Sequence, residues 1–163
     1  MADSGSADAI RSLMFRYAEC VDTANFAGLG ELFEHGRMLS DRGEEQGMGG
    51  DEIPAFYART NKVHENGTLR TRHISANIIF EIDEDADEAR VRSVYVVCQA
   101  AGKLPLQPIV AGRYRDRFVR VDGEWRFAER MVLVDLIGDM REHLSFDLSK
   151  QQSVDHQAGE TWD

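Results

Sequence analysis

Two residues with acid–base side chains stand at the edges of patterned segments. Asp22 ends a run of helical periodicity, and His73 lies near the start of a run in which polar and apolar residues alternate. A carboxylate that holds an imidazole orients it and stabilises its charged form, so that the imidazole can act as a general base. Taken one at a time, an Asp at a helix end is more often a cap, and a His in a strand is more often satisfied or exposed. The residue types alone leave both interpretations open.

The other groups that could bind a metal or a phosphate form no recognisable pattern. A surface position is expected for the remaining histidines, which lie in polar or loop-like surroundings: His35, His64, His143 and His156. No set of His, Asp and Glu has the spacing of metal ligands. A phosphate-binding loop follows a strand, whereas no strong strand precedes Gly47, Gly49 and Gly50. We therefore predict neither a metal nor an organic cofactor.

Charge and hydropathy argue against two classes of partner. The formal net charge is −10, which repels the phosphate backbone of nucleic acid. Arg113, Arg115 and Arg117 alternate along a predicted strand and share one face, which favours a solvated or subunit-contacting face over an anion site. No segment approaches the roughly 20 apolar residues that span a bilayer. Met1 to Asp8 has neither the basic nor the apolar region of a signal peptide.

Periodicity near 3.6 predicts helices in the first third of the chain. In the first helix the apolar positions are Ile10, Leu13, Met14, Tyr17, Ala18 and Val21. A second, shorter helix ends at Gly36, and its inward residues are Phe26, Leu29, Leu32 and Phe33. The segment Ser40 to Gly50 predicts a loop or a weak hairpin. Asp51 is expected to cap a third helix, whose core-facing residues are Ile53, Phe56 and Tyr57.

After Gly67 the period changes to 2, which indicates strands. Between Arg72 and Ile82 the even positions are apolar and the odd positions, Ile79 excepted, are polar. Further strands are predicted over 91–101, 109–121 and 124–136, the last two joined by a hairpin turn at Asp122-Gly123. Alternation does not decide which face of the first strand looks inward. Whether His73 and Asn77 line the interior therefore stays open.

The order of helices before strands predicts an α+β domain, with helices on one face of a curved antiparallel sheet. The 163 residues suit one domain over 9–140, preceded by a disordered segment 1–8 and followed by a surface-wrapping tail 141–163. Cys20 and Cys98 lie in apolar segments, which favours buried free thiols and a cytoplasmic location. The sheet carries more apolar surface than three short helices cover, so a homodimer or homotrimer is expected.

Several stretches resemble the SnoaL-like branch of the NTF2-like superfamily. They are residues 16–22 (RYAECVD), 68–73 (TLRTRH), 112–116 (GRYRD) and 122–127 (DGEWRF), and the resemblance spans roughly 8–137. The last element is common across the superfamily and indicates the fold rather than the chemistry. The resemblance implies the cystatin/NTF2-like cone, with N-terminal helices packed on a curved antiparallel sheet.

The resemblance also implies a catalytic pair. In scytalone dehydratase, hexachlorocyclohexane dehydrochlorinase and bile-acid 7α-dehydratase, an Asp at the end of the first helix meets a His at the start of the strand after the third helix. Asp22 and His73 occupy these places. Tyr17 resembles a Tyr five residues before the Asp in the bile-acid enzyme, which implies a proton donor. Arg130 resembles a pocket Arg of the dehydrochlorinase.

The chain departs from scytalone dehydratase at two places. That enzyme has a second His on its next strand, whereas residues 99–101 contain none. Its Ser and Asn on the third strand are replaced by Gly112 and Tyr114. These departures indicate that the chain is not scytalone dehydratase.

Two functions follow from the resemblance. The first is a cofactor-independent lyase of the dehydratase type, or an isomerase, that removes a proton from a small hydrophobic cyclic molecule. The residues expected to contact that molecule are Phe56, Tyr57, Asn77, Tyr95, Tyr114, Phe118 and Arg130. The alternative is a non-catalytic ligand-binding or accessory subunit similar to the small subunit of ring-hydroxylating dioxygenases, with a small or plugged cup.

Overall fold

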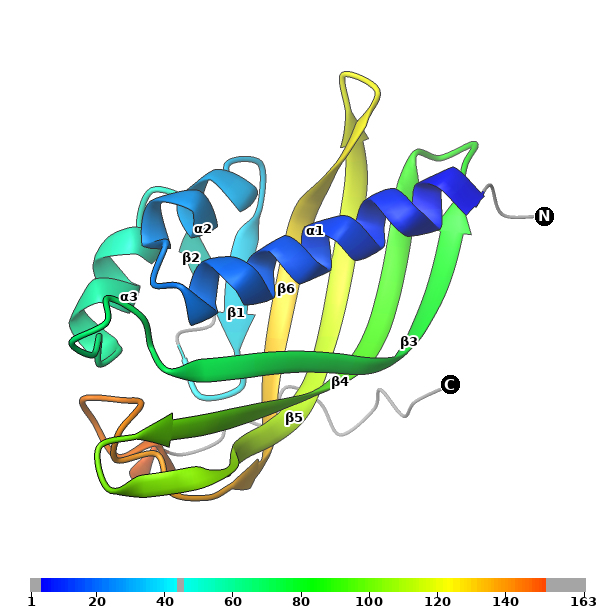
Figure 1. Cartoon of the computed structure of the whole chain (residues 1–163). Helices are drawn as coiled ribbons and strands as arrows, with labels where there is room; N and C mark the ends of the chain where they lie inside the picture. The colour runs from blue at the N-terminus through cyan, green and yellow to red at the C-terminus, as the bar shows by residue number, and fades with distance from the viewer. Residues whose placement is uncertain (1–3, 44–45, 152–163) are drawn as a thin grey trace.

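The computed structural model describes residues 4–43 and 46–151. Three helices, α1 (Ser4–Asp22), α2 (Phe26–Leu32) and α3 (Ile53–Thr60), pack on one six-stranded sheet (Figure 1). The strands are β1 (Arg37–Ser40), β2 (Met48–Gly49), β3 (Thr71–Asp83), β4 (Glu88–Ala101), β5 (Leu104–Val121) and β6 (Glu124–Ile137). Their order in the sheet is β2-β1-β6-β5-β4-β3. The α+β prediction is confirmed, although the pairing of β1 with β6 is parallel, so the sheet is mixed.

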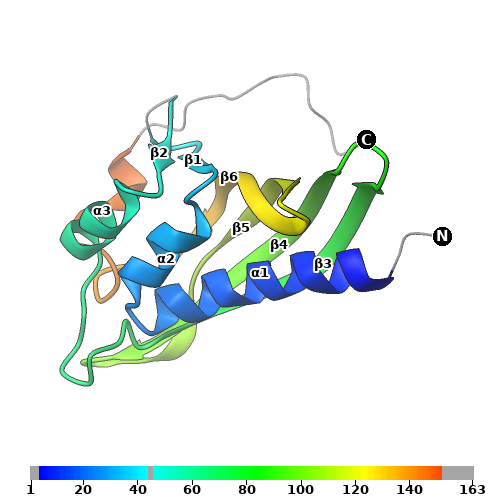
Figure 2. The ribbon, with the colours of Figure 1, turned by 90° about the horizontal axis from the view of Figure 1, so that it is seen from above.

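Helix α1 lies along the sheet and follows the predicted apolar stripe. Ile10, Met14, Tyr17 and Val21 are buried on its sheet-facing side. The views in Figures 1 and 2 show α1 alongside the long strands, with α2 and α3 grouped near its C-terminal end. The helix begins at Ser4, so the predicted disorder over 1–8 is wrong for residues 4–8, and residues 1–3 lie outside the described chain. No helix among the described residues is long and apolar enough to cross a membrane.

The shorter helices differ from the sequence prediction at their ends. Helix α2 ends at Leu32, before Gly36, and the backbone N–H of its C-cap residue Phe33 donates to the carbonyls of Gly30 and Glu31. The N-cap of α3 is Glu52 rather than Asp51, and Glu52 accepts a hydrogen bond from the backbone of Gly49 instead of capping the helix. The preceding segment forms the weak hairpin β1–β2, which places α3 beside the sheet.

A bulge in β3 determines which residues of this strand face the helices. Its pairing with β4 shifts register between Ala76 and Ile79, and Asn77 has a positive φ of 51°. An extra residue in one strand reverses the alternation beyond it. Before the bulge the odd positions, including His73, face inward, and after it the even positions, including Phe80, do. His73 therefore faces the interior, which alternation alone left open. Asn77 is exposed at the bulge.

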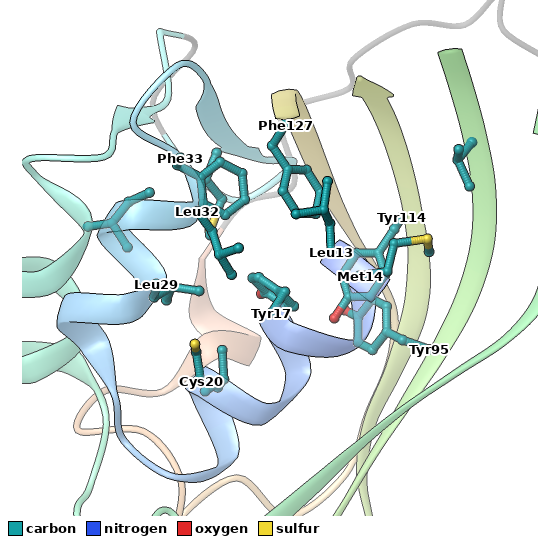
Figure 3. Packing of buried hydrophobic residues seen from close by; sticks show 14 of the residues in the cluster. Leu13, Met14, Tyr17, Cys20, Leu29, Leu32, Phe33, Tyr95, Tyr114 and Phe127 are labelled. Carbon is teal, nitrogen blue, oxygen red and sulfur yellow. The ribbon is translucent and has the colours of Figure 1, made fainter. Parts of the chain in front are cut away.

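Aromatic residues from the helices and the sheet form the centre of the core. Phe33 stacks on Phe127 with ring centroids 4.8 Å apart, and Tyr17 meets Tyr114 edge to face at 5.9 Å. Figure 3 shows these side chains converging between α1, α2 and the strands. Such pairs contribute beyond their buried area, about 0.5–1.5 kcal/mol each. They fix the height of α1 above the sheet, and with it the position of the end of α1.

The segment after β6 returns to the helices. Leu144 forms an isolated bridge with Asn61, and Ser145 donates a backbone hydrogen bond to Thr60 at 2.9 Å. This orange segment lies beside α3 in both Figure 1 and Figure 2. A 3-10 turn follows at Leu148–Lys150. The described part of the predicted tail therefore packs against the domain, and residues 152–163 lie outside the described chain.

Candidate active site

Asp22 and His73 meet at the end of α1. The Nδ1 atom of His73 lies 2.6 Å from Oδ1 of Asp22, and both side chains are only 9% exposed. An ionised carboxylate only accepts hydrogen bonds, so Nδ1 carries the hydrogen and a neutral His73 has a bare lone pair on Nε2. No partner for Nε2 is found among the described residues. This is the arrangement of an oriented general base.

The carboxylate of Asp22 also fastens α1 to the start of β3. Oδ1 accepts a second hydrogen bond from Oγ1 of Thr71 at 2.7 Å, and Oδ2 accepts one from the backbone N–H of His73 at 3.0 Å. The backbone N–H of Leu69 donates to the carbonyl of Asp22 at 3.2 Å. The side chain of Asp22 therefore does not cap α1. It binds the first residues of β3 and orients His73.

Two opposing effects set the pKa of Asp22. Burial raises the pKa of this carboxyl, but the hydrogen bonds and charge of His73, with the Thr71 hydroxyl, lower it by more. The net pKa therefore lies below the ordinary value of an Asp. Asp22 stays ionised at neutral pH, as a group that stabilises an imidazolium must.

A cavity of about 890 Å³ opens in front of His73. Its floor is the inner face of the sheet, and its remaining walls come from α1, α3, the β1–β2 hairpin and the segment after β6. Four of the predicted substrate-contacting residues line it: Phe56, Tyr57, Tyr95 and Tyr114. Tyr17 and His73 line it too. This volume lies in the range of cavities that enclose a whole small molecule.

The tyrosines give the cavity neutral hydroxyl groups. The hydroxyls of Tyr17 and Tyr57 are 3.3 Å apart, and that of Tyr57 also donates to Sδ of Met38 at 3.3 Å. Burial, followed by the neighbouring Tyr17, raises the pKa of both Tyr57 and Tyr114 well above the usual value for a phenol. These groups therefore act at neutral pH as hydrogen-bond donors and acceptors, not as phenolates.

Three residues predicted to contact a substrate do not line the cavity. Asn77 is exposed in the β3 bulge, and Phe118 is fully buried in the core. Arg130 is also fully buried and holds Asp116 through two hydrogen bonds of 2.9 and 2.7 Å. These predictions need correction, because Asn77 lies in the bulge, Phe118 and Arg130 are fully buried, and none of the three is among the residues that line the cavity.

Arg130 packs against two of the tyrosines that line the cavity. Its guanidinium lies 4.2 Å from the ring centre of Tyr17 and 4.1 Å from that of Tyr114. Burial opposes its charge, but Asp116 outweighs this and raises the pKa of Arg130. A planar cation between two tyrosines and a carboxylate fixes both rings. Arg130 therefore positions the two tyrosines that form the cavity wall.

His143 was missed by the sequence interpretation. It was expected at the surface, yet only 6% of it is exposed and it lines the cavity, with its ring centre 6.3 Å from that of His73. The apolar residues Met140, Leu144 and Leu148 around it were the available signal, because they indicate a packed segment. His35 does lie at the surface, with a side chain 43% exposed. His156 lies outside the described residues.

No group of three or more metal-ligating side chains occurs within residues 4–43 and 46–151. The acid–base groups at the site are imidazole, carboxylate and phenol. Asp22 contacts His73, and the hydroxyls of Tyr17 and Tyr57 contact each other.

The match to a family model decides the relationship of this chain to known proteins. The model of the SnoaL-like domain matches residues 3–131. The chain belongs to the SnoaL-like family. Its fold is the cystatin-like fold of NTF2-like proteins. No curated protein matches the chain at a significant level.

Solved structures of SnoaL-like and related proteins superpose on this chain. A scytalone dehydratase-like protein from Novosphingobium aromaticivorans is 25% identical, with 82% of this chain and 87% of that chain covered and a TM-score of 0.63. LinA is 19% identical, with 84% and 90% covered and a TM-score of 0.61. The β subunit of an aromatic-ring-hydroxylating dioxygenase from N. aromaticivorans is 19% identical, with 80% and 89% covered and a TM-score of 0.58. The last two likenesses concern the fold alone.

Proposed function

We propose that this SnoaL-like protein is a cofactor-independent lyase of the dehydratase type, acting on a small, hydrophobic, cyclic hydroxy-carbonyl compound. The observation that carries the proposal is the 2.6 Å contact of Asp22 with Nδ1 of His73 at the wall of the cavity. It leaves Nε2 of His73 as the base. An isomerase would use the same first step, and the fate of the resulting enolate separates the two activities.

The reaction begins when Nε2 of His73 removes a proton from the carbon next to the substrate carbonyl. Asp22 stabilises the imidazolium that results, and the electron pair of the C–H bond becomes that of an enolate. The enolate then forms a C=C bond and expels the hydroxyl on the neighbouring carbon. That hydroxyl takes the proton back from His73, directly or through the hydroxyl of Tyr17, and leaves as water. The protein returns to its initial state.

Shape and polarity of the cavity support this substrate class. Val97, Val110 and Val132 give it apolar walls, and the rings of Tyr95 and Tyr114 stack with centroids 4.4 Å apart. Flat or fused rings suit such a surface. The phenol hydroxyls supply the few polar contacts that orient a ligand.

The test is turnover of a panel of cyclic β-hydroxy ketones, followed by the ultraviolet absorbance of the conjugated enone. The wild-type protein should dehydrate at least one member, and His73→Ala should lower kcat by about 10²–10⁴-fold. The control is His35→Ala, which removes an exposed imidazole outside this cavity and should leave kcat unchanged. An unchanged circular dichroism spectrum shows that each variant is folded. Full activity of His73→Ala would remove the base from the mechanism.

The accessory-subunit alternative is supported by the fold likeness to a dioxygenase β subunit. It predicts a small or plugged cup, whereas the cavity here is about 890 Å³. Native mass spectrometry after co-expression with a dioxygenase α subunit tests it, since an accessory subunit should form a stable mixed complex and show no turnover alone. The same measurement tests the proposed homodimer or homotrimer, which the exposed sheet residues Ile74 and Ile79 support.

A further inference from the structure

Hydrogen bonds to its backbone carbonyls hold the turn that carries His143 against the rest of the domain. The carbonyl of His143 accepts a hydrogen bond from the backbone of Lys62 at 2.8 Å. The carbonyl of the preceding Glu142 accepts two more, from Nε2 of His64 and from Nε2 of Gln99, each at 2.9 Å. The β3–β4 end of the sheet and the segment after α3 therefore both hold this turn. These three hydrogen bonds hold the backbone at His143 and at the residue before it.

The imidazole of His143 is buried without a protein partner. Its Nδ1 atom is enclosed and makes no hydrogen bond to the described residues. Nε2 is not enclosed in this way, and the ring lines the cavity. An enclosed nitrogen without a partner is less unfavourable as a bare lone pair than as an N–H group. The favoured tautomer therefore carries its hydrogen on Nε2.

The surroundings keep this ring neutral. Burial, and then the neighbouring His73, lower the pKa of His143 to about 3, and His64 acts more weakly in the same direction. The negative charge of Asp22, which is hydrogen-bonded to His73, acts to raise the pKa of His143 but is outweighed. A neutral imidazole at neutral pH can donate a hydrogen bond without bringing a second positive charge beside the imidazolium that His73 becomes.

From this geometry we infer that His143 is a second catalytic residue, whose Nε2–H donates a hydrogen bond to the carbonyl oxygen of the substrate. The inference rests on the proposed function and specifies its substrate class, because it requires an acceptor oxygen next to the carbon that loses its proton. His73 presents a lone pair and His143 presents a hydrogen, so the two imidazoles act on the C–H and the C=O of one molecule. A neutral imidazole of lowered pKa is a known way to polarise a carbonyl and stabilise an enolate.

A purely structural role fits the same observations less well. An imidazole that served packing alone would leave both ring nitrogens without a partner among the described residues, which an apolar side chain of similar size would avoid. Nε2, unlike Nδ1, is not enclosed, and the ring lines the cavity, so the oxygen of a ligand can accept the hydrogen of Nε2.

Binding of 2-naphthol and naphthalene tests the inference without a known substrate. Both are flat and apolar, but only 2-naphthol has an oxygen that can stand for the enolate oxygen. Isothermal titration calorimetry should show that wild-type protein prefers 2-naphthol. His143→Phe, which keeps the ring and removes the donor, should lower this preference about three- to tenfold, the effect of one hydrogen bond. His143→Gln, which keeps an N–H donor, should retain most of it, as should the control His35→Phe.

Two results would overturn the inference: no preference for 2-naphthol in the wild-type protein, or the same preference in His143→Phe. If His143→Phe does not fold, the ¹⁵N spectrum of histidine-labelled wild-type protein decides. It should show His143 as the Nε2–H tautomer and neutral between pH 5 and 8, with a shift on addition of 2-naphthol. A protonated His143, or no shift, would be decisive against it. These outcomes are independent of the turnover of His73→Ala, so this inference can fail while the proposed function stands.

Discussion

Replacement of His143 should change how the stability of the protein depends on pH. In the folded protein its pKa is lowered to about 3 from 6.5, chiefly by burial and then by His73. As the pH falls below 6.5, the unfolded chain takes up a proton at His143, whereas the folded protein keeps the ring neutral until about pH 3. The stabilisation from a neutral ring is therefore fully present above pH 6.5 and is lost progressively as the pH falls toward 3.

The size of this effect follows from the two pKa values. A tenfold change in proton affinity corresponds to about 1.4 kcal/mol. The whole loss between neutral pH and pH 3 is then about 5 kcal/mol, and about 2 kcal/mol of it falls between pH 7 and pH 5. That is a large part of the roughly 5–15 kcal/mol by which a domain of this size is stable. Below pH 6 the free energy of unfolding should fall by roughly 1.4 kcal/mol per pH unit through this residue.

Urea denaturation at several values between pH 5 and pH 7 measures this directly. The free energy of unfolding of the wild-type protein should fall between these values by about 2 kcal/mol more than that of His143→Gln. The comparison uses the difference between pH values, so an overall loss of stability in the variant does not affect it. His35→Gln is the control, because this side chain is 43% exposed, and it should follow the wild-type curve.

Parallel curves for the wild-type protein and His143→Gln would refute this reasoning. They would mean that His143 titrates alike in the folded and unfolded states. The ring would then be solvated, and neither its burial nor its neutrality could contribute to the site.

Further predictions concern the groups around the cavity. Asp116→Ala leaves the charge of Arg130 buried without its partner, so calorimetry should show a loss of about 3–5 kcal/mol in stability; a loss under 1 kcal/mol would contradict the buried pair. Asn77→Gly should leave turnover unchanged, and Asn77→Val should cost about 1–2 kcal/mol in urea denaturation, because a β-branched residue does not tolerate a φ of 51°. Equal stability of the two variants would argue against the bulge. Asp22→Asn should lower kcat by about 10³–10⁴-fold with little change in KM, since it holds the wrong tautomer of His73. A KM effect alone would show that Asp22 serves binding instead.

Much of the fold follows from local patterns in the sequence. The apolar stripe of α1 and the turn at Asp122-Gly123 were predicted because each depends on neighbours in the chain. Both residues of the turn have a positive φ, 51° and 82°, as a two-residue hairpin loop requires. The ends of the short helices α2 and α3 were less predictable. The N-cap residue of α3 is Glu52, whose side chain binds the backbone of Gly49 instead of the helix.

The site was predictable only where family resemblance supplied long-range information. Asp22 and His73 are 51 positions apart, and nothing local in either segment predicts their contact. The inward face of β3 depends on one extra residue at Asn77, which strict alternation cannot register. His143 reaches the cavity through hydrogen bonds to Lys62 and through its neighbour Glu142, contacts that exist only once the sheet has formed.

The most direct test of the central claim is hydrogen exchange at carbon. Cyclic β-hydroxy ketones are incubated with the protein in D₂O, and proton NMR follows the loss of the C–H signal next to the carbonyl. Proton abstraction by the Asp22–His73 pair predicts exchange or elimination with wild-type protein and a rate lower by about 10³-fold or more with His73→Gln and with Asp22→Asn. Equal rates in all three proteins would show that this pair removes no proton from carbon.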